Sequence, residues 1–351
     1  MQSRIRVGCL FGGQSPEHEV SVRSAQSILS QLDRQKYEVI PIKIDKNGTW
    51  YFLEEQESFP GESLFSPCTL SQYLDVIFPI LHGPNGEDGT VQGLARLANL
   101  PIVGPDCLSS AMCMDKGIMK ELLKGAALPI PKYQVLHFTD AIEIADILST
   151  FAFPLFVKPA AHGSSVGISK VKKEEELLPA LEEAFTYDER VLIEEGIEGR
   201  EIECSVLGNL NPKVSLPGEV IPTHEFYTYE AKYLDENGAF FELPAALPEK
   251  VTQELQSLAI AAFKTLRCEG MARIDFFLEK SSGRLLINEL NTIPGFTSTS
   301  LYPKLWEISG IPYSTLLSEL IDLAIERHHR LKQRGIRACH QLKQAKAAKC
   351  N

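Results

Sequence analysis

The sequence predicts a multidomain α/β protein that begins with an open parallel sheet. Three apolar stretches in the first hundred residues alternate with segments of helical pattern, which indicates parallel strands joined by helices. Beyond about residue 150, strands follow one another with loops between them, which is typical of an α+β arrangement. A chain of 351 residues has room for two or three domains of ordinary size.

The N-terminal part opens with a strand, a glycine turn and a helix. The strand is expected at residues 5–11, where the pair Gly12-Gly13 ends it. A helix is expected from about residue 16 to residue 32, with proline near its first position. A second strand is expected at residues 39–44, and together these elements form the beginning of a parallel sheet.

The segment 82–90, with the sequence HGPNGEDGT, follows a third expected strand at residues 76–81. It precedes a helix that ends near Leu100, so it should lie at the carboxyl edge of the sheet, where ligands bind in such folds. A domain boundary is expected near residues 114–116. Two short helices then lead to a strand at residues 153–158.

After this boundary, strands are joined mainly by loops. Residues 162–167 are expected to form a flexible hairpin loop that leads to a strand at residues 168–171. Further strands are expected at residues 191–194 and 201–207, and a long irregular stretch follows at residues 217–248. A connection of that length is usually functional.

The C-terminal part is expected to hold a helix at residues 248–265, a hairpin at 272–290 and a loop at 291–300. An amphipathic helix is expected at residues 315–326. The charged residues of the tail, 331–351, are all basic, so the tail either extends that helix or is disordered.

Composition and charge argue against several classes of protein. Hydrophobic residues make up 44% and charged residues 23%, close to the average for soluble chains. A net charge of −11 disfavours nucleic acid as the main partner, because phosphate backbones attract basic surfaces. The sequence shows no signal-peptide or membrane-span pattern, and its eight cysteines lack C-x-x-C spacing. We therefore expect a cytoplasmic protein with reduced thiols and no membrane partner.

The hairpin at residues 272–290 carries the most informative polar pattern. A three-residue turn with Gly283 in the left-handed position pairs Lys280 with Arg284. The same register places a carboxylate opposite a carboxylate and a guanidinium opposite a carboxamide, all on one face: Asp275 across from Glu289, and Arg273 across from Asn291.

Two carboxylates that face each other across a strand pair repel, so a cation is expected between them. Oxygen ligands without histidine or cysteine suit a hard cation, and Mg²⁺ that also binds phosphate oxygens is the natural occupant. A solvent-facing polar stripe would give the same pattern and remains the alternative at this point.

A loop rich in glycine and serine at residues 163–167 is a candidate phosphate site, because small residues let backbone amides approach phosphates. The loop also matches the G-x-S-x-G elbow of serine hydrolases, but that motif needs a following helix and a strand is expected here. The chain lacks a G-x-x-x-x-G-K-[ST] loop, and Gly12-Gly13 lack the third glycine of a dinucleotide site. The residues alone thus indicate an Mg²⁺-dependent nucleotide enzyme of another fold.

Taken together, the motifs resemble those of D-alanine:D-alanine ligases of the ATP-grasp superfamily, over residues 5 to about 325. The segments that carry the resemblance are GGQSPEHEVS (12–21), LHGPNGEDGTVQG (81–93), MDK (114–116), VKP (157–159), GSSVG (163–167), YEAKY (229–233), RIDF (273–276) and NELNTIPGFTSTS (288–300). The resemblance implies an N-terminal open parallel sheet domain at 1–115, a two-part ATP-grasp fold at 116–203 and 204–330, and the basic tail.

The resemblance implies that ATP binds between two sheets. Lysines would contact the phosphates and the base, and carboxylates would contact the base and the ribose. The implied positions are Lys116 and Lys158 on the adenine and α/β-phosphate side, Glu194 near the base, Glu201 near the ribose, and Lys232 at the γ-phosphate.

The resemblance also implies two Mg²⁺ ions, with Mn²⁺ as a substitute, held by Asp275, Glu289 and Asn291. These are the residues that the hairpin register brings together. The ammonium of a first D-alanine would be bound by Glu17 with help from His82, where Glu17 also complements the dipole of its helix.

In the family, the carboxylate of the first D-alanine attacks the γ-phosphate to give an acylphosphate, and the amine of the second D-alanine attacks that carbonyl. The resemblance assigns Arg273 and the amide of Gly295 to the resulting oxyanion. It assigns Ser300 and the amide of Leu301, at a helix start, to the second carboxylate. The product would be D-alanyl-D-alanine for peptidoglycan precursors.

Ser164 and Tyr233 are implied to join the phosphate loop and the long loop to Glu17, so that the site closes over the acylphosphate. The sequence departs from common family members at the pair Ala161-His162 and in its basic tail. A homodimer is the usual assembly of the family.

Three alternatives remain at this point. The nearest is a ligase that adds D-lactate or D-serine, which the residue beside Lys232 would distinguish. A nucleotide-binding regulatory protein without turnover would be favoured by loss of Asp275, Glu289 or Arg273, all of which are present. A dinucleotide oxidoreductase would need the missing glycine fingerprint.

Overall fold

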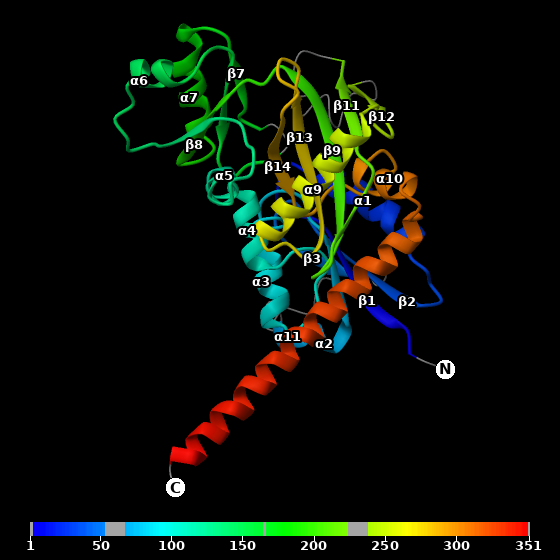
Figure 1. Cartoon of the computed structure of the whole chain (residues 1–351). Coiled ribbons are helices and arrows are strands. Elements are labelled where there is room, and N and C mark those ends of the chain that lie inside the picture. Colours follow the sequence, from blue (N-terminus) through cyan, green and yellow to red (C-terminus); the bar gives the residue numbers. More distant parts are fainter. Residues whose placement is uncertain (1–2, 53–66, 164–165, 224–237, 350–351) are drawn as a thin grey trace.

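Three sheets make up the body of the protein, and one long helix projects from it (Figure 1). The computed structural model describes residues 3–52, 67–163, 166–223 and 238–349, with the side chains of the last helix described as far as Arg334. The predicted mixed α/β class is confirmed.

The N-terminal sheet contains the strands β1 (Ile5–Gly12), β2 (Tyr37–Ile44), β3 (Trp50–Phe52) and β4 (Val76–Ile80). Their order is β3-β2-β1-β4, and β1 runs parallel to both β2 and β4. The expected parallel sheet is thus confirmed for three strands. The edge strand β3 pairs antiparallel with β2, and three residues are too few to show a sequence pattern.

The helices of this part are α1 (His18–Gln31), α2 (Pro67–Tyr73), α3 (Thr90–Leu97) and α4 (Cys107–Met114). Helix α1 agrees with the expected helix and buries Val20, Ala25 and Ile28. Since β4 ends at Ile80, the segment that begins at His82 lies at the carboxyl edge of the sheet, as expected.

The central sheet contains β5 (Tyr133–His137), β6 (Leu155–Pro159), β7 (Ser169–Val171) and β8 (Arg190–Glu195). Its order is β5-β8-β6-β7, with antiparallel pairing throughout. The helices here are α5 (Lys116–Gly125), α6 (Ile144–Thr150) and α7 (Leu177–Phe185), and a 3₁₀ turn (Glu174–Glu176) precedes α7. The sequence pattern does not predict the edge strand β5, in which only Leu136 is buried, or the short helix α7.

The C-terminal sheet contains β9 (Gly199–Gly208), β10 (Lys213–Val214), β11 (Gly218–Pro222), β12 (Ala239–Glu242), β13 (Gly270–Glu279) and β14 (Leu285–Asn291). Its order is β12-β11-β9-β13-β14, and β10 pairs with β9. The expectation of one irregular stretch at residues 217–248 is wrong, because β11 and β12 pair within it. Residues 224–237 lie outside the described part.

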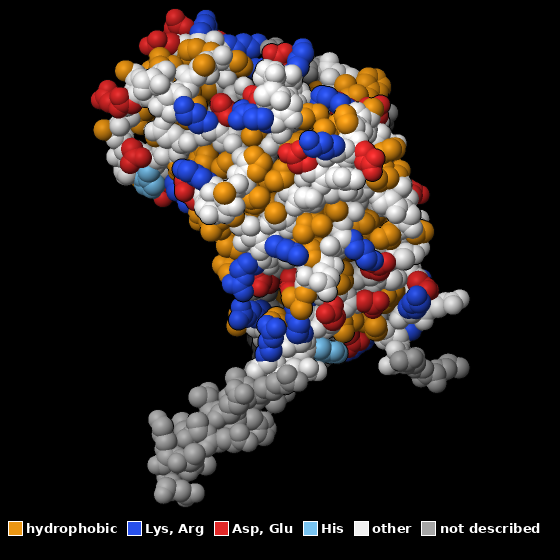
Figure 2. Space-filling view, in the orientation of Figure 1, with side chains coloured by type: hydrophobic (Ala, Val, Ile, Leu, Met, Phe, Trp, Pro, Cys, Tyr) orange, Lys and Arg blue, Asp and Glu red, His pale blue; other side chains and the backbone are white. Residues whose placement is uncertain are grey.

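The remaining helices are α9 (Glu249–Thr265), α10 (Leu301–Ile308) and α11 (Tyr313–Lys349). The basic tail is expected from the sequence either to extend the preceding helix or to be disordered. The structure has the first arrangement, since α11 continues through the tail to Lys349. Lys and Arg side chains gather near the point where α11 leaves the body (Figure 2). Among the described helices none is by itself long and apolar enough to cross a bilayer, although α10 and the start of α11, bent by 106° to each other, pass that test as a pair.

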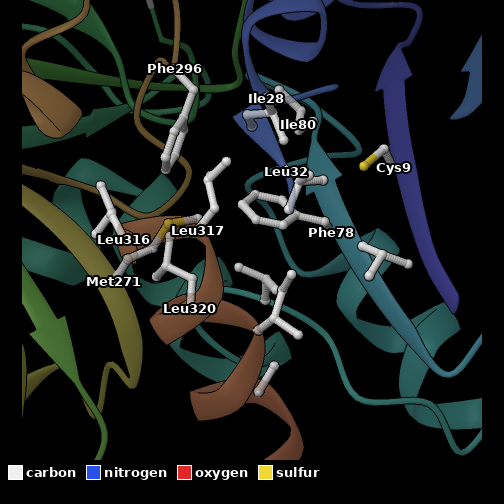
Figure 3. Packing of buried hydrophobic residues seen from close by; sticks show 14 of the residues in the cluster. Cys9, Ile28, Leu32, Phe78, Ile80, Met271, Phe296, Leu316, Leu317 and Leu320 are labelled. Carbon is white, nitrogen blue, oxygen red and sulfur yellow. The ribbon is translucent and has the colours of Figure 1, made fainter. Parts of the chain in front are cut away.

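One hydrophobic cluster joins the N-terminal and C-terminal parts of the chain (Figure 3). Phe78 of β4 and Leu320 of α11 belong to it, and both are fully buried. Phe296, from the loop before α10, packs edge-on against Phe78 with ring centroids 6.0 Å apart. The loop that precedes α10 is therefore anchored in the same core as the first sheet.

The hairpin β13–β14 confirms the register expected at its polar end and corrects it at its tip. Asp275 pairs with Glu289 and Arg273 with Asn291, as predicted. The predicted pair of residues 280 and 284 is wrong, because the Glu279 amide donates to the carbonyl of residue 284. A register shift between Asp275 and Phe276 compensates for this offset.

We expect the anchoring of α11, and not its projecting end, to determine stability. Leu320→Ala should lower the free energy of unfolding by about 2–5 kcal/mol, because it leaves a cavity in the shared core. Truncation after Arg334 should cost less than about 0.5 kcal/mol, because the side chains that lead into the removed segment, at residues 331–334, are exposed. Urea unfolding of both variants measures this, and a truncation as costly as Leu320→Ala would contradict it.

Candidate active site

A cavity of about 1090 Å³ lies between the carboxyl edge of the N-terminal sheet and the C-terminal sheet. Most of the candidate residues from the sequence line it: Glu17, His82, Gly163, Glu201, Arg273, Asp275, Glu289, Asn291, Gly295, Ser300 and Leu301. Lys116, Lys158 and Glu194 lie outside this lining, in the buried cluster described below. Ser164, Lys232 and Tyr233 fall outside the described residues.

Arg273 is the central cation of the cavity. Its Nε and Nη2 donate to Oδ1 and Oδ2 of Asp275 at 2.8 and 2.7 Å. Its Nε also lies 2.8 Å from Oε2 of Glu203, a buried β9 residue that sequence reasoning missed. Burial would lower the pKa of Arg273, but these carboxylates outweigh it and hold the pKa well above its usual value. Arg273 is therefore a permanent and fixed cation.

The opposed residues at the polar end of the hairpin form an oxygen-rich group. Asn291 donates from Nδ2 to Oδ2 of Asp275 at 3.0 Å, and Glu289 lies across the strand pair from Asp275. Within the described residues, no cluster of three His, Cys, Asp or Glu side chains is arranged around a metal position. Two carboxylates with one carboxamide nonetheless match the ligand chemistry of Mg²⁺, which takes few protein ligands and keeps oxygens from water or phosphate.

Glu17 and His82 meet where the first helix faces the segment after β4. Glu17 is buried, and a Cβ at Gly83, whose φ is +72°, would lie only 2.6 Å from its Oε2. His82 donates from Nδ1 to the carbonyl of Ile293 at 3.0 Å. Burial lowers the pKa of His82, although Glu17 opposes this, so the ring is neutral near pH 7.

Glu87 ties the two walls of the cavity together and was not singled out from the sequence. Its Oε2 accepts from the amide of Gly83 at 2.8 Å, and its Oε1 accepts from the amide of Ile293 at 3.0 Å. Burial, with a smaller contribution from Glu17, raises the pKa of Glu87 to about 8. Its position within HGPNGEDGT was the only sequence signal for it.

The loop before α10 forms a compact turn at the start of a helix. Oγ of Ser300 accepts from the amide of Thr297 at 2.9 Å. A Cβ at Gly295 would lie 2.7 Å from the same Oγ, so only glycine lets the two residues approach so closely. Ser300 is the N-cap of α10 and Leu301 its first residue. The positive end of the helix thus faces the cavity.

A second polar cluster is buried in the central sheet. Nζ of Lys158 lies 2.6 Å from Oε2 of Glu194, and Nζ of Lys120 lies 2.5 Å from Oε1. Burial opposes ionisation of Glu194, but the two lysines outweigh it and lower its pKa to about 2. Lys116 donates to the carbonyl of His162 at 2.5 Å, at the start of the glycine loop. Lys120 was not among the residues predicted from the sequence.

A fixed guanidinium and a helix start that line the same cavity are groups that bind anionic substrates, and the opposed carboxylates beside them suit a cation that would accompany such a substrate. Family models for the N-terminus and the C-terminus of D-ala D-ala ligases match residues 6–105 and 122–322. The chain is 48% identical to a D-alanine--D-alanine ligase of Thermoanaerobacter sp. (strain X514), over 92% of this chain and 97% of that protein.

Solved structures of similar proteins agree. The D-alanine-D-alanine ligase of Coxiella burnetii has a TM-score of 0.83 at 40% identity, covering 97% of this chain and 99% of that one. The VanG D-Ala:D-Ser ligase of Enterococcus faecalis has a TM-score of 0.81 at 35% identity, covering 92% of this chain and 100% of that one. The D-alanine--D-alanine ligase of Bacillus anthracis complexed with ATP has a TM-score of 0.76 at 30% identity, covering 93% of this chain and 99% of that one. This chain belongs to the D-alanine--D-alanine ligase family.

The raised pKa of Glu87 predicts a specific pH dependence of stability. The folded protein keeps this proton up to about pH 8, whereas an ordinary glutamate loses it near 4.5. Stability from the protonated carboxyl is therefore complete below pH 4.5 and is lost as the pH rises toward 8. Relative to Glu87→Gln, the wild-type free energy of unfolding should fall between pH 5 and pH 8.

Urea unfolding of both proteins at several pH values measures this difference. The matched control is Glu182→Gln, which changes an exposed residue of α7 and should run parallel to the wild type. If the free energy of unfolding changes with pH in the same way for Glu87→Gln and the wild type, Glu87 has the same pKa in the folded and the unfolded protein, and the prediction is wrong.

Proposed function

We propose that this protein joins two D-alanine molecules into D-alanyl-D-alanine for peptidoglycan precursors, with ATP as the phosphate donor and an acylphosphate as the intermediate. The observation that carries the proposal is the row formed by Arg273, Asp275, Glu289 and Asn291 on the paired strands β13 and β14 at the cavity. Membership of the ligase family supports the reaction, and the relative complexed with ATP supports the donor.

The first D-alanine would bind beside α1. Glu17 offers a buried carboxylate to the substrate ammonium, and a charge-assisted hydrogen bond of this kind is strong in a partly dry site. The neutral ring of His82 is fixed by Ile293, so it adds no competing positive charge. The carboxylate of this substrate would then point toward the nucleotide phosphates.

The second D-alanine would bind at the start of α10. Ser300 and the amide of Leu301 would hold its carboxylate, with the helix dipole favouring the negative charge. Its amine would attack the acylphosphate carbonyl, and the oxyanion that forms would be stabilised by Arg273 and the amide of Gly295. The oxyanion would then collapse to the peptide bond as the C–O bond to phosphate breaks and inorganic phosphate leaves. Donors fixed in advance, as Arg273 is by Asp275, stabilise such charge without reorganising during the reaction.

The nucleotide would lie between the central and C-terminal sheets. Lys116 and Lys158 would contact its phosphates and base, Glu194 the base, and Glu201 the ribose. Lys232 is assigned to the γ-phosphate by resemblance and lies outside the described residues.

Asp275, Glu289 and Asn291 are proposed to hold two Mg²⁺ ions, or Mn²⁺ in their place. Bound there, these ions would neutralise phosphate charge, so that a carboxylate can approach the γ-phosphate.

We also infer a reducing cytoplasmic location and a homodimer. The location is supported by the cysteines at positions 9, 113, 204 and 268, which are free and buried. The homodimer rests on the family resemblance. Neither nucleic acid nor a membrane is proposed as a partner, in keeping with the net charge of −11.

Phosphate release from ATP and Mg²⁺ tests the proposed function. Release should need D-alanine, and mass spectrometry should show the dipeptide as the product. L-alanine and D-lactate serve as comparison acceptors and should give much less product. ATP turnover without any dipeptide would overturn the proposal.

Glu289→Gln should abolish ligation and leave the fold intact. The change keeps the size of the side chain but removes half of the opposed negative charge at the proposed metal position. The matched control is Glu279→Gln at the far end of the same hairpin, which should retain wild-type activity. Phosphate release at saturating Mg²⁺ is the measurement, and undiminished turnover of Glu289→Gln would rule out its assignment as a ligand.

Acceptor choice is predicted to depend on Tyr233, which lies outside the described residues. D-alanine must lose its ammonium proton before it attacks, whereas the hydroxyl of D-lactate is neutral, so charge and hydrogen bonding in the site select between them. Tyr233→Phe should keep nucleotide binding and raise the share of D-alanyl-D-lactate when both acceptors compete near neutral pH. An unchanged ratio of dipeptide to depsipeptide, with activity retained, would remove Tyr233 from acceptor control.

A further inference from the structure

Lys120 is a buried cation that the proposed reaction does not use. It lies one helical turn after Lys116 on α5, and only 1% of its surface is exposed. Lysine is almost never buried to this extent unless it is paired. Its position therefore requires an explanation in terms of its partners.

Its first partner is Glu194. Nζ of Lys120 lies 2.5 Å from Oε1 of Glu194, and Nζ of Lys158 lies 2.6 Å from the other oxygen. The side chain of Glu194 is itself 2% exposed, so both oxygens are held by ammonium groups away from solvent. A carboxylate bound in this way is ionised and has a fixed orientation.

Its second partner belongs to the other side of the proposed nucleotide site. Nζ of Lys120 donates to the carbonyl of Asn288 at 3.4 Å. Asn288 precedes Glu289 in β14 and lines the cavity. Lys120 thus connects β8 of the central sheet with β14 of the C-terminal sheet, the two sheets between which the nucleotide is proposed to lie.

We propose that Lys120 is a positioning residue for adenine recognition, which holds Glu194 as a fixed group that only accepts hydrogen bonds. This inference rests on the proposed function, in which Glu194 faces the base and Lys158 reaches the phosphates. When Lys158 turns to the phosphates, Lys120 remains as the counter-ion of the buried carboxylate.

The chemistry of the two purines explains why this would select ATP. Adenine presents a 6-amino donor where guanine presents an oxygen acceptor. An ionised carboxylate accepts from the amino group but leaves the guanine oxygen unpaired and repelled, which a buried site penalises strongly. A carboxylate that has lost Lys120 is protonated more easily, because burial favours the neutral acid, and the acid can donate to guanine.

The test compares ATP with GTP in the D-alanine-dependent release of phosphate. Lys120→Met should raise the KM for ATP more than it lowers kcat. It should also reduce the ratio of kcat/KM for ATP to that for GTP at least tenfold. The matched control is Lys124→Met, an exposed residue of the same helix whose Nζ lies 5.7 Å from the Tyr133 ring centroid, compared with 6.0 Å for Lys120. The control should keep the wild-type ratio.

A folded Lys120→Met enzyme with the wild-type ratio would overturn the inference. If the single change prevents folding, the pair Lys120→Met with Glu194→Gln carries the test, since it removes both buried charges. The ratio of kcat/KM for ATP to that for GTP should be the same in the double variant as in Glu194→Gln alone, because Lys120 acts through Glu194. A lower ratio in the double variant than in Glu194→Gln would overturn the inference.

Calorimetric binding of ADP and GDP separates this inference from the proposed ligation. A wild-type protein that makes no dipeptide would overturn the proposed function. Lys120→Met would still support the positioning role by losing the preference for ADP, and would contradict it by keeping the preference. The double variant would support the role if its preference equals that of Glu194→Gln alone, and would contradict it if the two preferences differ.

Discussion

The mutual repulsion of Asp275 and Glu289 is the constraint on which the rest of the site depends. The pairing of β13 with β14 places these carboxylates opposite each other, and an arrangement of this kind is stable only with positive charge close by. The guanidinium of Arg273 supplies it to Asp275, and Glu203 on β9 balances the other side of Arg273. In the sheet order β13 lies between β9 and β14, which places all of these groups on neighbouring strands.

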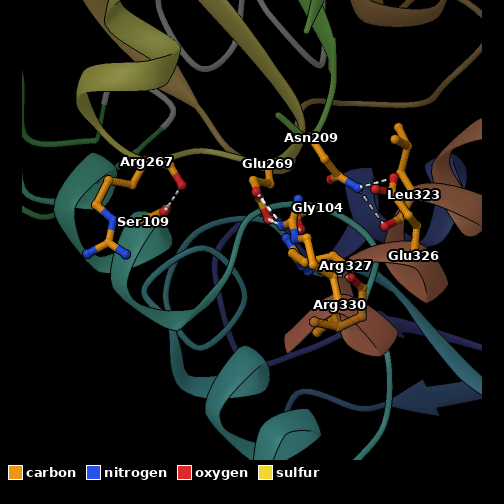
Figure 4. A network of polar contacts seen from close by, with 10 residues as sticks. Gly104, Ser109, Asn209, Arg267, Glu269, Leu323, Glu326, Arg327 and Arg330 are labelled. Carbon is orange, nitrogen blue, oxygen red and sulfur yellow. Dashed lines mark hydrogen bonds and ion pairs between the residues drawn. The ribbon is translucent and has the colours of Figure 1, made fainter. Parts of the chain in front are cut away.

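The cavity has walls from both ends of the chain, so its shape depends on the junction between them. Helix α11 forms that junction, and Figure 4 shows its polar contacts with the N-terminal and C-terminal parts. Buried Arg327 donates to the carbonyls of Ile102 and Gly104 at 2.7 Å each, which ties the helix to the N-terminal part. Arg330 pairs with Glu269 just before β13. Apolar packing holds α11 against the body of the protein. The hydrogen bonds of Arg327 and the ion pair of Arg330 are directional, so they fix the orientation of the two walls relative to each other.

Sequence reasoning recovered the parallel strands and the polar hairpin because both rest on short-range patterns. It could not recover Lys120, Glu87 or Glu203, since a single lysine or glutamate is most often a solvated surface residue. Only the tertiary structure buries Lys120 and brings Glu87 to the amides of two separate segments. The register at Asp275 was predicted correctly although the tip was not, because the shift beside Phe276 offset the error in turn length. The domain limits and the catalytic roles stay predictions.

The register shift in the hairpin also separates two parts that differ in how strictly their length is constrained. On the tip side of the shift, Phe276 pairs with Ile287, and both are buried in an apolar cluster. On the other side, the polar residues keep their own alignment with β9 and with each other. The exposed tip at residues 280–283 can therefore gain, lose or exchange residues without rotating the carboxylates away from the cavity. The hairpin end is thus a permissive place for sequence drift, and also for a grafted peptide or label.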